Sequence, residues 1–194
     1  MRKAAFILMG LGILVIVAGQ IYVSLQPEPA PPVVANTTTL RSTEGGDVVG
    51  FIDKYGARSW QGIPFAQPPV GSLRWRAPQP PIPNENTLQA LKPGALCPQF
   101  ASLLSGAGEQ APQGRIAGNE DCLYLNIWSP PNASKRPVML WIHGGGNTIG
   151  HSGRYHGGNL AASQGVIVVA VQYRLGPLGW FRHRALRGEG TTTP

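Results

Sequence analysis

The stretch VMLWIHGGG, residues 138–146, carries the strongest structural signal in the chain. Its first five residues form a short apolar run, which is typical of a strand buried on both faces of a sheet. The three glycines at positions 144–146 lack side chains, so the backbone can turn sharply there and bring bare N–H groups to one point. Converging N–H donors of this kind can stabilise a negatively charged oxygen.

The residues that follow extend this motif into an α/β pattern. A second apolar run at 166–173, VIVVAVQY, predicts another buried strand. Between the two runs, residues 159–164 suit a short helix, with Asn159 as its N-cap and Gly165 as its terminator. Strand, glycine turn, helix and strand begin a βαβ unit, so the sequence predicts an α/β fold.

Shorter elements are predicted upstream. Residues 47–52 and 57–61 indicate two short strands, which a tight turn at 54–56 joins into a small β-hairpin. Residues 122–128 alternate enough for a further strand. The stretch 64–98 contains nine prolines and therefore predicts irregular surface loop.

The composition indicates one loop-rich globular domain, or slightly more. The chain has 194 residues, of which 42% are hydrophobic and 13% charged, so a disordered chain and a coiled coil are both disfavoured. The formal net charge is +7, but the basic side chains are scattered and do not alternate with aromatic ones. We therefore expect no nucleic-acid partner.

The N-terminus predicts export. Two basic residues precede an apolar run from Ala4 to Val23, and about twenty helical residues span a hydrocarbon core of ~30 Å. The run favours an uncleaved membrane anchor, although Val17-Ala18-Gly19 would serve as the cleavage site of a signal peptide. Either way, we expect the chain after Gln26 to face the periplasm or the cell exterior.

Three parts of the chain follow from this interpretation. Residues 1–25 are the membrane anchor or signal peptide, with membrane contact through residues 4–25. Residues 26–39 begin with several prolines and predict an extended linker. The folded part is expected at 40–194.

Export also gives the two cysteines a context. In an oxidising compartment, Cys97 and Cys122 could form a disulfide that closes a loop of about 25 residues, worth roughly 3–4 kcal/mol. Two buried free thiols are the alternative.

Several motifs together resemble the type-B carboxylesterase family, the cholinesterase-like branch of the α/β-hydrolases. The resemblance rests on EDCLYLNIWSP at 120–130, WIHGGG at 141–146 and YRLGPLGWF at 173–181. The segments QGIPFA at 61–66 and LRW at 73–75 support it, and the whole match runs from about Leu40 to Ala185. An HGGG pattern after a central strand is the oxyanion loop of lipases and esterases.

This resemblance implies a fold, an activity and specific residues. The chain would be the N-terminal portion of an α/β-hydrolase fold, a small N-terminal β-hairpin plus the first strands of the central sheet. The substrate would be a small-molecule carboxylic ester, with no cofactor and no metal. The family implies oxyanion-hole N–H groups from Gly145 and Gly146, a disulfide between Cys97 and Cys122, and an ion pair between Arg74 and Glu120.

Three further positions are compared with the family pattern. His143 precedes the glycines and would orient the loop, since it is not the family's catalytic base. Asn147 departs from the aromatic or small residue often found after the glycines, which puts the shape of the acyl pocket in doubt. Gln67 stands where an acidic residue is common, with no obvious functional meaning.

The catalytic triad is absent from this sequence. The family's nucleophile sits in G-x-S-x-G on a strand-to-helix turn, and no such motif occurs among the 194 residues. The nearest match, GHSGR at 150–154, lacks the final glycine and follows no strand, so Ser152 is not expected to be the nucleophile. The chain therefore resembles a fold truncated before the nucleophile elbow. An unpaired, apolar edge is then expected at 166–173, and residues 27–194 made alone should be inactive and poorly soluble.

Three functional hypotheses remain from the sequence. The first is a carboxylic-ester hydrolase that acts by serine acyl transfer, of which this chain holds the oxyanion loop. The second is a catalytically dead family member that serves as a surface binding or adhesion module. The third is a non-functional truncated remnant.

Overall fold

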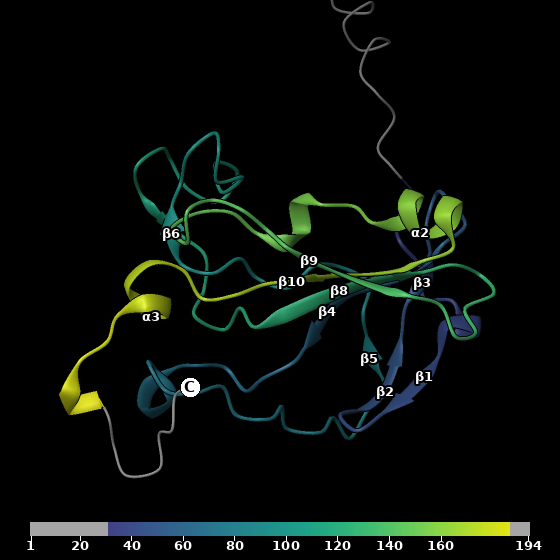
Figure 1. Ribbon diagram of the computed structural model, residues 1–194, viewed down its shortest axis with the longest axis horizontal. Helices are drawn as coiled ribbons and strands as arrows, with labels where there is room; N and C mark the ends of the chain where they lie inside the picture. Colours follow the sequence, from purple (N-terminus) through teal and green to yellow (C-terminus); the bar gives the residue numbers. More distant parts are fainter. Residues whose placement is uncertain (1–30, 187–194) are drawn as a thin grey trace, which may run out of the picture. The chain divides into compact units, whose positions relative to one another are not determined.

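The computed structural model describes residues 31–186 (Figure 1). Contacts divide the chain into two units, 1–32 and 33–194, and of the first only Pro31 and Pro32 are described. The predicted anchor at 1–25 and the first part of the predicted linker lie outside the described residues. Among residues 31–186, no helix has both the length and the apolar character needed to cross a bilayer.

Ten strands and six short helices are assigned within the described residues. The strands are β1 (Arg41–Thr43), β2 (Gly46–Val49), β3 (Phe51–Ile52), β4 (Arg58–Pro64), β5 (Leu88–Gln89), β6 (Gln99–Phe100), β7 (Ile116–Ala117), β8 (Tyr124–Ser129), β9 (Val138–Ile142) and β10 (Ile167–Val171). The α-helices are α2 (Gly158–Gln164) and α3 (Gly176–Trp180). The 3-10 turns are η1 (Thr37–Thr39), η2 (Gly71–Leu73), η3 (Ser152–Arg154) and η4 (Arg184–Leu186).

The main sheet has five strands in the order β3-β4-β8-β10-β9. β10 pairs antiparallel with β8 and parallel with β9, and Val171 lies opposite Ile142 in the parallel register. A parallel pair needs a crossover connection, which α2 supplies here. Smaller sheets of order β1-β2-β5 and β6-β7 complete the strand pairing of residues 31–186.

This strand order corrects the predicted edge. The sequence led us to expect an unpaired edge at 166–173, but β10 is central and β9 lies at the edge of the sheet within the described residues. All five residues of β9 are exposed, so its apolar run is not buried on both faces as predicted. Crossover connections between parallel strands are right-handed, so the sheet face that α2 covers decides on which side of β9 the strand β10 pairs. The apolar sequence of β9 does not indicate which face the helix covers.

Helix α2 packs over β8 and β10 and covers one face of the sheet (Figure 1). Ala161 of α2, Trp128 of β8 and Val168 of β10 are all buried in one cluster beneath it. The helix approaches closely, because a Cβ on Gly157 would lie 2.7 Å from the Val168 side chain. The N-cap is therefore Gly157 rather than the predicted Asn159, while Gly165 ends the helix in the left-handed conformation as predicted.

The opposite face of the sheet is covered by the small sheet of β1, β2 and β5. Val48 of β2 and Trp60 of β4 are buried together there, with Leu88 of β5 packed against them. The Trp60 indole N–H donates to the carbonyl of Thr39, whose own side chain is fully buried. Residues 37–39, placed in the linker from sequence, therefore pack against the folded part.

A tight turn at the predicted place joins β3 to β4. The Asp53 carboxylate accepts hydrogen bonds from the N–H groups of Tyr55 and Ala57, which closes the turn. The predicted strand at 47–52 is broken at Gly50, because that residue lies directly against the Ser59 carbonyl and leaves no room for a Cβ. Its two halves, β2 and β3, join different sheets.

Exposed apolar side chains on an edge strand predict self-association of the isolated chain. We expect Leu140→Lys, at a position 58% exposed on β9, to raise the soluble fraction several-fold, because a lysine on an edge opposes pairing with another strand. The measurement is the soluble fraction after centrifugation, followed by analytical ultracentrifugation.

Gln110→Lys adds the same charge in an exposed loop and controls for net charge. Equal gains from both variants would contradict a role of the β9 edge. A wild-type chain that is already a soluble monomer would contradict the predicted aggregation itself.

Candidate active site

The glycine loop, defined here as residues 144–150, follows β9 after the single residue His143. Gly145 and Gly146 have φ values of 121° and 60°, in the region that favours glycine. At Gly145 a side chain is also excluded by space, because a Cβ there would overlap the carbonyl oxygen of Ile149. The N–H groups of Thr148 and Ile149 both donate to the Gly145 carbonyl at 3.1 Å, so the loop closes on itself.

The loop leaves the backbone donors of Gly145 and Gly146 free. Gly145 and Gly146 are exposed, and within residues 31–186 no acceptor is recorded for the N–H of either residue. Two adjacent N–H groups without protein partners can donate to an anionic oxygen from outside the loop. These are the donors that the family resemblance implied.

His143 lies beneath the loop and is 2% exposed. Its ring stacks on Tyr173 with centroids 4.3 Å apart, and its Nδ1 lies 3.0 Å from the Gly144 carbonyl oxygen. Burial lowers the pKa of His143, so the neutral ring is favoured, with Nδ1 as the donor to Gly144. Its Nε2 is buried and has no hydrogen-bond partner among the described residues. This geometry fits the orienting role that the sequence suggested.

Two contacts from the chain after β10 hold the loop from the other side. The Tyr173 hydroxyl donates to the His143 carbonyl, and burial raises the pKa of Tyr173, which keeps that donor protonated. The N–H of Gly176 donates to the Asn147 carbonyl at 2.7 Å. Asn147 itself has a φ of 60°, so this departure from the family pattern occupies a left-handed position that asparagine tolerates.

The cysteines and the predicted ion pair lie on the neighbouring loops. A disulfide joins Cys97 and Cys122, both fully buried. The Arg74 Nε and Nη2 atoms each donate to one oxygen of Glu120 at 2.6 Å, a bidentate arrangement. Hydrogen bonding to Glu120 raises the pKa of Arg74 further.

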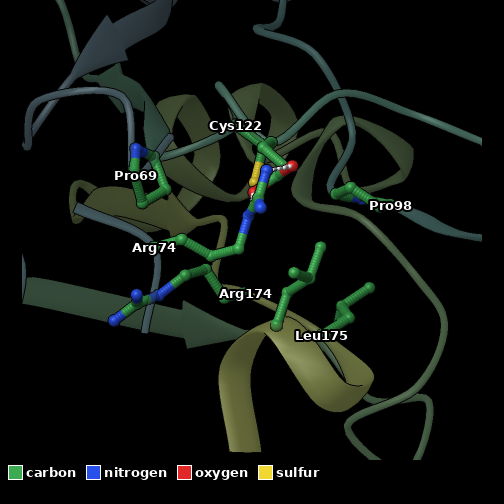
Figure 2. A pocket seen from close by; sticks show the side chains of 8 residues that line it. Pro69, Arg74, Pro98, Cys122, Arg174 and Leu175 are labelled. Carbon is green, nitrogen blue, oxygen red and sulfur yellow. Dashed lines mark hydrogen bonds and ion pairs between the residues drawn. The ribbon is translucent and has the colours of Figure 1, made fainter. Parts of the chain in front are cut away.

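A small cavity lies between this ion pair and Leu175 (Figure 2). Its volume of about 10 Å³ is enough for about one water molecule, so it does not bind an ester. Arg174 also lines it, and burial lowers the pKa of this arginine.

Ser152 is a buried structural residue in this fold. It is 5% exposed, and its Oγ accepts a hydrogen bond from Asn126 at 3.3 Å. Its N–H donates to the side chain of Gln172 at 2.8 Å. These hydrogen bonds account for a buried serine at this position without a catalytic role.

Comparison with known proteins identifies the family. The model of the carboxylesterase family matches residues 37–190. The chain belongs to the carboxylesterase family.

Individual relatives agree with this assignment. The chain is 44% identical over 147 residues to para-nitrobenzyl esterase of Bacillus subtilis (strain 168), which covers 74% of this chain and 29% of that protein. It is 42% identical over 168 residues to fumonisin B1 esterase of Sphingopyxis macrogoltabida. This match covers 82% of this chain and 29% of that protein. This carboxylesterase-family chain thus spans about 29% of the length of these two relatives.

Solved structures of carboxylesterases have the same fold. A PNB esterase structure has a TM-score of 0.67 at 41% identity, covering 76% of this chain and 30% of that one. The Geobacillus stearothermophilus carboxylesterase has a TM-score of 0.62 at 32% identity, and the match covers 73% of this chain and 28% of that one. The prediction of an N-terminal portion of an α/β-hydrolase fold is confirmed.

The contacts of Tyr173 with the site were not predicted from the sequence. Tyr173 stood in the family-like segment YRLGPLGWF, but no pattern indicated that its hydroxyl binds the His143 carbonyl. Gln99, which contacts Gly150, was also missed.

Gly145 and Gly144 provide a matched pair for testing the loop. We expect Gly145→Ala to lower the free energy of unfolding by about 1–3 kcal/mol, because a Cβ there meets Ile149 and the φ of 121° is strained for alanine. Urea titration in the soluble Leu140→Lys background measures the change.

Gly144→Ala is the control, because nothing lies within 4 Å of a Cβ at that position. Its effect should stay within about 0.5 kcal/mol. Equal losses for the two variants would contradict the conformation assigned to the loop.

The buried His143 and the partly buried His151 predict a pH dependence of stability. Burial lowers the pKa of both His143 and His151, so the unfolded chain binds more protons below the ordinary histidine pKa of about 6.5. The stability they contribute is complete above that value and is lost as pH falls through it towards the folded-state pKa. Urea titrations at about pH 7.5 and about pH 5.5 should show the loss.

The His143→Phe variant keeps the ring stacked on Tyr173 and cannot be protonated. We expect it to lose less stability between the two pH values than wild type, whereas His183→Gln, at an exposed position, should behave as wild type. A His143→Phe chain with the full wild-type pH dependence would exclude His143 as its source.

Proposed function

We propose that this chain provides the oxyanion loop of a carboxylic-ester hydrolase. The observation that carries the proposal is the pair of free N–H groups at Gly145 and Gly146, held at the end of β9 in a carboxylesterase-family fold. A plain turn has no need for adjacent exposed donors beside a glycine, Gly145, whose position excludes a side chain. The binding-module hypothesis does not explain them.

In the proposed reaction, a serine from polypeptide outside these 194 residues attacks the carbonyl carbon of the ester. The carbonyl oxygen becomes an anion, and the N–H groups of Gly145 and Gly146 donate to it. The alcohol leaves, and water then attacks the acyl-serine and releases the acid. His143 and Tyr173 act only on the loop, by fixing the two peptide groups that lead into Gly145.

The proposed substrate class is a small-molecule carboxylic ester. Names such as para-nitrobenzyl esterase and fumonisin B1 esterase indicate ester substrates for those relatives.

We also infer export to an oxidising compartment. The support is the buried disulfide, together with the basic residues and apolar run at the N-terminus. Alkaline phosphatase fused after Thr43 should be active, since it needs an oxidising compartment, and deletion of 1–25 should abolish that activity. A fusion without activity in cells would contradict export.

The gene read beyond the codon for Pro194 tests the catalytic proposal. We expect a strand followed by G-x-S-x-G and a helix, and the extended protein should hydrolyse p-nitrophenyl acetate and react with a fluorophosphonate. In that protein, Gly145→Ala should lower kcat about 10²–10³-fold, the usual effect of losing one oxyanion donor, because the Cβ meets the Ile149 carbonyl and displaces the Gly145 N–H.

Gly144→Ala is again the matched control and should keep most of the activity. A stop codon in every frame with no such element would exclude serine catalysis by this gene product. The binding-module and remnant hypotheses would then be the ones that stand.

A further inference from the structure

Gln99 lies at the base of the glycine loop and binds both polar backbone groups of Gly150. The N–H of Gly150 donates to Gln99 Oε1 at 2.7 Å, and Gln99 Nε2 donates to the Gly150 carbonyl at 3.0 Å. Gln99 is 5% exposed, so this pairing is largely shielded from water. One side-chain amide thus pairs with Gly150 as a neighbouring strand would.

Gly150 closes the loop against the peptide that leads into the oxyanion donors. Its φ is 109°, and a Cβ there would lie 2.6 Å from the Gly144 carbonyl oxygen and 2.8 Å from His143 Nδ1. The position of Gly150 therefore limits where Gly144 can lie, and through Gly144 it limits the direction of the Gly145 N–H. A side chain that fixes the position of Gly150 therefore also fixes the direction of the Gly145 N–H.

The backbone that carries Gln99 is itself held on two sides. Gln99 of β6 pairs with Ala117 of β7, and its Nε2 also donates to the Cys97 carbonyl at 3.1 Å. Cys97 is joined by the disulfide to Cys122, two residues before β8. The amide of Gln99 is thereby connected to the central sheet by covalent and hydrogen bonds.

We propose that Gln99 is a positioning residue for the oxyanion loop. It touches no reacting atom and acts through Gly150 on the peptide before Gly145. This proposal rests on the proposed function for its catalytic meaning, but its physical content, the fixing of the loop by one buried amide, can be measured without catalysis.

The first experiment measures amide hydrogen exchange by NMR on the full 194-residue chain in the soluble Leu140→Lys background. In Gln99→Leu, the amide of Gly150 should lose protection about tenfold, the factor expected for losing one net hydrogen bond, and Thr148 and Ile149 should follow. The amides of β10 should not change. Gln110→Leu, at an exposed glutamine of the same disulfide loop, is the matched control and should leave the glycine loop unaffected.

A second variant separates positioning from simple packing. The protonated side chain in Gln99→Glu can accept from the Gly150 N–H and donate to its carbonyl, as the amide does, whereas the ionised side chain has no donor and faces the carbonyls of Cys97 and Gly150. We expect wild-type protection at about pH 4 and the behaviour of Gln99→Leu at about pH 8. Wild type measured at the same pH values accounts for the titration of His143 and His151, and for the charge of Arg154 near them.

The outcomes are distinct. Unchanged protection at Gly150 in Gln99→Leu would overturn the proposal, and so would an equal loss at Ala117 and across β10, which would mean general loosening. Lack of pH dependence in Gln99→Glu would also overturn it.

In the extended protein, Gln99→Leu should lower kcat about tenfold with little change in KM, since the loop acts on the transition state. An inactive extended protein with the predicted exchange pattern would refute the proposed function and leave Gln99 as the residue that fixes the loop.

Discussion

The parallel pairing of β9 with β10 is the constraint on which the candidate site depends. Parallel strands end at the same edge of a sheet, and the register places Ile142 opposite Val171. The residues that follow each strand therefore meet, which brings the ring of His143 onto Tyr173. A shift of one residue in this register would turn the two rings to opposite faces and separate the Tyr173 hydroxyl from the His143 carbonyl.

Hydrogen bonds to the backbone hold the glycine loop, which has few side chains to pack. Tyr173 binds the carbonyl before the glycines, Gly176 binds the carbonyl of Asn147, and Gln99 binds Gly150 at the far end. Contacts of this kind fix the direction of peptide N–H groups without filling the space above them. A loop held in this way can keep two donors exposed and still be preorganised for an anionic oxygen.

The disulfide-bounded loop and the proline-rich loop support the same region from outside the sheet. The bidentate pair of Arg74 and Glu120 ties the proline-rich segment to the start of the segment that leads into β8. Its energetic value is modest where water reaches both side chains, but its planar geometry restricts how the two loops can move. The irregular part of the chain is thus positioned by a few specific contacts rather than by regular structure.

By itself the sequence determined the local features of this protein and its family. The bounds of β9, the glycine loop and the left-handed Gly165 follow from β-branched runs and glycine placement, which act over a few residues. The tertiary structure alone decided that β10 lies inside β9, that Gly157 is the N-cap of α2, and that Gln99 and Tyr173 reach the glycine loop. These depend on which sheet face the crossover helix covers and on contacts between residues 30 to 51 positions apart. Local propensity has no information about such contacts, because their partners are set only when the sheet has formed.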